Sequence, residues 1–128
     1  MIVRTAHAAR RPLAVVLLAA LFATVAVSDL WQVGMFLAGR NSEVPGLMLA
    51  HAVLGLVGAA AATAVWRRSS WSVWLAALWG VLTAALLASL PSVLGLAAEE
   101  RGGVWVGAAV VLLVAAFAAW YLRRHTPA

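Results

Sequence analysis

One carboxylate inside an apolar stretch, and one imidazole in the next such stretch, are the residues best placed to do chemistry. Asp29 lies within VAVSDLWQVGMF (residues 25–36), and His51 lies within the apolar run that follows. An acid and an imidazole can share a hydrogen bond or exchange a proton, and an imidazole can also bind a metal. Asp29 and His51 are therefore the centre of a candidate polar site.

The composition indicates that membrane-spanning helices position this pair. The chain has 128 residues, of which 66% are hydrophobic and 10% charged, and its mean hydropathy is +1.01. Soluble domains carry about a quarter charged residues, so lipid must surround most of this chain. The length has room for one domain. We predict a single integral membrane domain covering residues 1–128.

Four apolar runs are long enough to cross a bilayer, which takes about 20 helical residues. They cover residues 13–37, 45–66, 71–96 and 103–122. The connections between them are short and polar, and short connections make neighbouring helices antiparallel. The sequence therefore predicts an all-α, integral membrane four-helix bundle in up-down-up-down order.

The arginines predict an orientation for this bundle. All nine basic residues are arginine. They cluster at the ends of apolar runs, and arginine at such positions marks the cytoplasmic side of a membrane. With both termini cytoplasmic, only Arg40 and Arg101 lie outside. The seven arginines then inside are Arg4, Arg10, Arg11, Arg67, Arg68, Arg123 and Arg124. Orientation explains the basic charge, so nucleic acid is not expected as a partner.

The sequence also predicts which membrane holds the chain and whether the first span is retained. Frequent alanine and arginine, whose codons are GC-rich, favour a bacterial inner (cytoplasmic) membrane. The stretch RRPLAVVLLAALFATVAVSD also resembles a signal peptide, with Ala26 and Ser28 before Asp29. Cleavage there would leave three spans. Because the apolar character resumes at once in LWQVGMFLAG, we favour a retained first span.

Asp29 and His51 are expected to pair because they lie at similar depth in the membrane. Asp29 and His51 lie at similar sequence distances on either side of Asn41, the centre of the first hairpin. With a rise of 1.5 Å per residue in both helices, they reach nearly equal depth. A lone charged residue costs about 2.5–3.5 kcal/mol at mid-membrane. We therefore predict a buried Asp29–His51 pair near the outer face.

Other polar residues fall at about the same depth. Gln32 is one turn from Asp29, and Ser89 and Ser92 flank Pro91, which leaves a backbone carbonyl without its amide donor. Asp29, His51, Gln32, Ser89 and Ser92 are predicted to form one polar pocket. A structural hydrogen-bonded clasp is the favoured interpretation, and a site for a proton, ion or cofactor is the alternative.

Small residues recur at helical spacing in three of the runs. The set expected to pack helices closely is Gly55, Gly58, Ala62, Gly80, Ala84, Gly103 and Gly107. Such faces let helix backbones approach one another in membranes, and their surplus could serve a homodimer or a larger membrane complex. The face below His51 could instead leave room for a flat ligand such as a porphyrin.

The stretch LMLAHAVLGLVGAAAATAVWRR resembles small four-span bacterial membrane proteins that are mostly uncharacterised. In outline it is also similar to the half-bundles of haem A synthase and other b-type cytochromes. The matching residues are His51, Leu54, Gly55, Arg67 and Arg68. The cytochrome resemblance implies haem on His51, but those proteins supply a second histidine from the fourth span, which here has none.

Met35 and Met48 are the other candidate axial ligands for a haem on His51, although Met48 lies on the same helix, one turn away. We therefore expect no cofactor and no metal site, with haem on His51 as the alternative. The chain has no cysteine, which excludes disulfides and thiolate ligands.

The sequence lacks the common catalytic motifs and so does not support an enzyme. The sequence has no phosphate loop, no HExxH and no GxSxG. The favoured interpretation is a non-catalytic helix-packing or accessory subunit of a membrane assembly. The alternatives are a proton-linked small transporter or channel that uses Asp29 and His51, and a haem-binding electron-transfer subunit.

Overall fold

The computed structural model describes residues 11–40 and 45–126. Within these residues the chain forms four helices and no strand: α1 (Leu13–Leu37), α2 (Pro45–Trp66), α3 (Trp71–Leu94) and α4 (Ala98–His125). All four are long and apolar enough to cross a membrane, which confirms the all-α class. Arg4, Arg10 and the expected turn centre at Asn41 lie outside the described residues.

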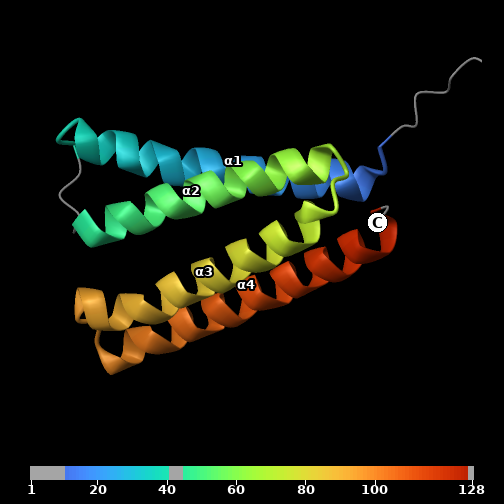
Figure 1. Cartoon of the computed structure of the whole chain (residues 1–128). Coiled ribbons are helices and arrows are strands. Elements are labelled where there is room, and N and C mark those ends of the chain that lie inside the picture. The colour runs from blue at the N-terminus through green and yellow to red at the C-terminus, as the bar shows by residue number, and fades with distance from the viewer. Residues whose placement is uncertain (1–10, 41–44, 127–128) are drawn as a thin grey trace, which may run out of the picture.

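The helices are arranged as two hairpins, α1 with α2 and α3 with α4 (Figure 1). Contacts within each hairpin are more extensive than the α2–α3 contacts that join the hairpins. The α2–α3 connection and the end of α4 lie at one end of the molecule, and the α3–α4 turn lies at the other (Figure 1). The α2–α3 connection is therefore close to the last turn of α4.

The first two helices have the bounds expected from hydropathy, but α3 ends earlier than predicted. The expected run continued to Leu96, whereas the helix stops at Leu94. Gly95 adopts a left-handed conformation with φ of 63°, which glycine tolerates without a steric penalty. The Leu96 amide then donates to the Pro91 carbonyl at 3.0 Å and closes the helix end.

The fourth helix is longer than its apolar run at both ends. It begins at Ala98 rather than at residue 103, and it continues to His125 rather than ending at residue 122. Glu99 and Glu100 lie in its first turn, and Arg123 and Arg124 lie in its last turn. Acidic residues stabilise the positive end of a helix dipole and basic residues the negative end. Charged residues expected in loops therefore extend α4.

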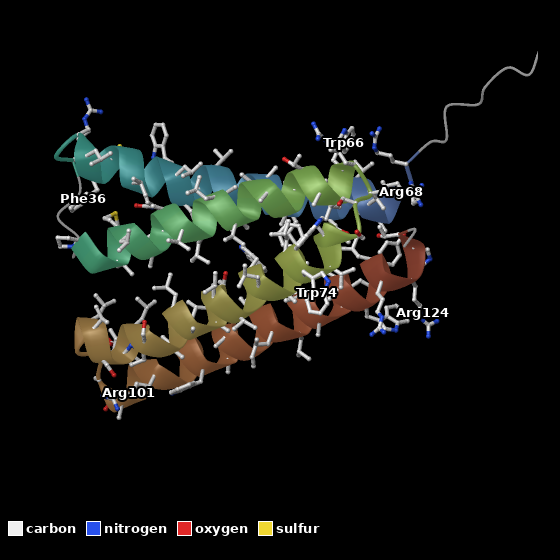
Figure 2. The ribbon with its side chains drawn as sticks, in the orientation of Figure 1. Phe36, Trp66, Arg68, Trp74, Arg101 and Arg124 are labelled. Carbon is white, nitrogen blue, oxygen red and sulfur yellow. The ribbon has the colours of Figure 1, made fainter. Side chains whose placement is uncertain are left out.

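The hydrophobic core takes residues from all four helices. Its centre is an edge-to-face contact between Phe22 of α1 and Trp79 of α3, with ring centroids 5.3 Å apart. The other buried members of this cluster are Val15, Ala19, Leu54, Ala61, Val65, Ala76, Ala118 and Leu122. Most of them belong to the first halves of α1 and α3 and the second halves of α2 and α4. The core thus lies toward the end that carries Trp66, Arg68 and Arg124 (Figure 2).

Candidate polar site in the first hairpin

Asp29 of α1 and His51 of α2 form a hydrogen bond across the first hairpin. His51 Nδ1 lies 2.8 Å from Asp29 Oδ1. The Asp29 side chain is 13% exposed and the His51 side chain 22% exposed. When the carboxylate is ionised, the Nδ1–H group of the imidazole donates to it. Asp29 and His51, which were predicted to pair because of their similar depth, are therefore in direct contact, and each is the hydrogen-bond partner of the other.

Two glycines hold α2 tightly against α1 beside this pair. A β-carbon added to Gly55, one turn after His51, would lie 2.8 Å from the side chain of Leu30. A β-carbon at Gly58 would lie 3.3 Å from that of Ala26. Larger residues would push the helices apart, so these glycines set the short interhelical distance that brings the acid and the imidazole together.

The same packing decides whether the histidine face can accept a porphyrin. The face of α2 formed by His51, Gly55 and Gly58 is occupied by Ala26 and Leu30 of α1. A flat macrocycle on that face would have to displace the helix that supplies Asp29. The residues present do not fit a haem on His51 within the closed hairpin.

The other candidate haem ligands, Met35 and Met48, lie in α1 and α2. Met48 is buried within the packed helices, and Met35 is half-buried on α1. Among the residues that the structure describes, no three histidine, aspartate or glutamate side chains are grouped closely enough to hold a metal ion.

The predicted polar pocket does not extend to α3. Ser89 is exposed, and its hydroxyl donates to the Leu86 carbonyl of its own helix at 2.7 Å. Ser92 is also exposed. Gln32 is half-buried one turn beyond Asp29. Depth alone placed the two serines beside Asp29, but in the structure both are exposed on α3, and Ser89 bonds within its own helix.

The small residues expected to pack helices fall into two groups. In α3, Ala84 is buried, and a β-carbon at Gly80 would overlap the methyl group of Ala115 in α4. Gly107 is half-buried, with Leu87 of α3 4.0 Å from its β-position. Gly103, by contrast, is exposed and has open space around it. Ala62 of α2 is half-buried beside α1.

Two arginines that the sequence assigned only to orientation also join separate helices. Arg11 Nε donates to the Trp66 carbonyl at 2.9 Å, and Arg68 Nη2 donates to the His125 carbonyl at 3.0 Å. The acceptors belong to the last residues of α2 and α4, whose carbonyls have no partner within the helix. Each arginine thus caps a helix end. Basic residues next to helix ends were the available signal.

A row of buried polar atoms on α3 was also missed. Ser72 Oγ, Trp79 Nε1 and Thr83 Oγ1 are buried without a hydrogen-bond partner among the described residues. Their spacing places them on one helical face, which contributes Trp79 to the core. The sequence signal was this regular spacing within an otherwise apolar helix.

The site centres on one acid–imidazole hydrogen bond between closely packed helices, and among the described residues no α3 or α4 side chain bonds to Asp29 or His51. It can hold two helices in register and can take up or release a proton. Comparisons with family models, curated proteins and solved structures found no match, so the resemblance to four-span bacterial proteins and b-type cytochromes finds no support beyond the four apolar helices.

Proposed function

We propose that this chain is a non-catalytic packing subunit of a membrane assembly, in which the Asp29–His51 pair is a structural clasp. The observation that carries the proposal is the mutual hydrogen bond at 2.8 Å within a glycine-packed helix interface. A polar pair of this kind in lipid favours one register of two helices, because any other register leaves both groups unpaired. Proton-linked transport through the same pair is the alternative, which the partial exposure of both side chains favours.

We further propose that the four helices cross a bacterial inner membrane in up-down-up-down order, with both termini cytoplasmic. The arginine distribution supports this orientation. The α2–α3 connection at one end of the molecule and the α3–α4 turn at the other support the order (Figure 1). The clasp then lies in the outer half of the membrane, and the hydrophobic core lies in the inner half.

Single-cysteine variants test the orientation, because the chain has no cysteine of its own. Ala38 and Ala97 are exposed beside the expected outer turns, and Ser70 is exposed in the inner connection. A membrane-impermeant thiol reagent should label Ala38→Cys and Ala97→Cys in intact cells. It should label Ser70→Cys only after the membrane is opened. Labelling of Ser70→Cys alone in intact cells would reverse the proposed orientation.

The partner surface that we propose is one face of α4. In the most apolar stretch of α4, 17% of the residues are buried, against 39% in the corresponding stretch of α2. Its exposed apolar residues at helical spacing are Val106, Val110, Leu113 and Phe117. Gly103 adds open space at the start of the same helix. A neighbouring helix could pack closely on this face.

Photo-crosslinking in native membranes tests the packing role. A benzophenone attached to Val110→Cys should give one discrete protein adduct, either with a larger membrane protein or with a second copy of this chain. The matched control is Leu17→Cys, an exposed apolar position on α1, which should give lipid adducts only. Lipid adducts alone from both positions would contradict the proposed partner face.

A further inference from the structure

A groove runs between α1 and α2 at the end of the molecule opposite the clasp. Its volume is about 560 Å³. The residues that line it are Val16, Ala19, Ala20, Ala23, Ala62, Thr63, Trp66 and Arg67. Alanines leave this space because they are too small to fill the gap between two helices. The Thr63 hydroxyl donates to the Ala59 carbonyl at 2.9 Å, so the walls are apolar apart from one end.

That end carries positive charge. Arg67 is exposed, and its guanidinium has no hydrogen-bond or ion-pair partner within residues 11–40 and 45–126. Arg11 stacks on Trp66, which also lines the groove, with Arg11 Cζ 4.0 Å from the centre of the indole ring. Trp66 lies at the same end of the molecule as Arg68 and Arg124 (Figure 2). Acidic side chains are absent from the lining.

We propose that this groove binds an anionic phospholipid, with one acyl chain along the alanines and the phosphate against Arg67 and Arg11. From Val16 to Ala23 the groove follows α1 for about 10 Å, at 1.5 Å per residue. A groove of this length accommodates the part of an acyl chain nearest the headgroup. Guanidinium groups bind phosphate oxygens through paired, charge-assisted hydrogen bonds.

The apolar walls and the charged mouth together select a lipid rather than a free anion. Basic pockets between membrane helices at the cytoplasmic surface bind anionic headgroups, and Trp66 is typical of the interface where headgroup and chain meet. The site is separate from the Asp29–His51 clasp and from the α4 face, so its occupancy does not depend on the packing role.

Native mass spectrometry of the purified, delipidated chain tests this site. The chain in mild detergent is mixed with equal amounts of phosphatidylglycerol and phosphatidylcholine that carry identical acyl chains. We expect preferential binding of phosphatidylglycerol. Arg67→Gln should weaken that binding about fivefold, as expected for one arginine beside an anionic lipid, and should weaken the binding of zwitterionic phosphatidylcholine less. Ala20→Leu should fill the groove and reduce the binding of both lipids.

The control is Arg101→Gln, an exposed arginine at the opposite end of the molecule (Figure 2). It should leave both lipids bound as in the unaltered chain, and a melting curve for each variant verifies that it is folded. Equal losses from Arg67→Gln and Arg101→Gln would show a general charge effect and overturn the site. Equal binding of the two lipids by the unaltered chain, or no effect of Ala20→Leu, would also overturn it.

Discussion

Gly80→Ala is expected to destabilise the protein by about 1–3 kcal/mol, the usual cost of overpacking a close contact. The added methyl group would overlap the methyl group of Ala115 on α4. Both groups are attached directly to the backbone, so neither can rotate away, and the two helices must separate instead. The measurement is the free energy of unfolding in mixed micelles, followed by circular dichroism.

The matched control is Gly103→Ala, which adds the same methyl group where nothing lies within 4 Å. Alanine is preferred over glycine in a helix by roughly 0.5–1 kcal/mol, so this variant should be neutral or more stable. Ala115→Gly in the Gly80→Ala background moves the methyl group to the facing helix and should recover much of the loss. Equal effects of Gly80→Ala and Gly103→Ala would contradict the α3–α4 contact.

Asp29→Leu and His51→Leu should each lower stability by about 1–3 kcal/mol, whereas the double variant should lose less than the sum. Each single change leaves one buried polar group without its partner, and the double change removes both groups. The hydrogen bond at 2.8 Å makes them directly dependent on one another. A double-mutant cycle in the same unfolding assay measures the coupling, which for residues in contact is about 0.5–3 kcal/mol.

Ser89→Ala is the control for this cycle, because its hydroxyl is exposed and bonds only within its own helix. Its effect should stay within about 0.5 kcal/mol. Strictly additive losses for Asp29→Leu and His51→Leu would contradict the clasp. Single variants as stable as the unaltered chain would also remove the structural role and favour the proton-linked alternative for the same two residues.

Hydropathy predicts the number and type of helices because lipid requires each crossing segment to satisfy its own backbone. The ends of α3 and α4 were less predictable. Gly95 ends α3 through its backbone conformation, and Glu99 and Glu100 extend α4 as part of its first turn. Neither effect depends on how apolar the residues are, so hydropathy does not predict where α3 ends or where α4 begins.

The pair at the centre of the site was predictable because depth in a hairpin depends only on counting residues from the turn. Ser89 and Ser92 have a suitable depth as well, yet they are exposed on α3. Their direction depends on how α3 is rotated about its axis and on how far the second hairpin lies from the first. Counting residues along the chain gives neither quantity. Gly55 and Gly58 were predicted to pack helices closely, but only the structure identifies α1 as the helix they contact.

The hydrogen bond from Arg68 to the His125 carbonyl has a consequence for biosynthesis. Its acceptor is made 57 residues after its donor, which at about 5–20 residues per second is a delay of several seconds on the ribosome. Asp29 and His51 are only 22 residues apart, so the first hairpin can close while the second is still being translated. The Arg68 contact can form only after α3 and α4 have both emerged, which makes it a late step in membrane insertion.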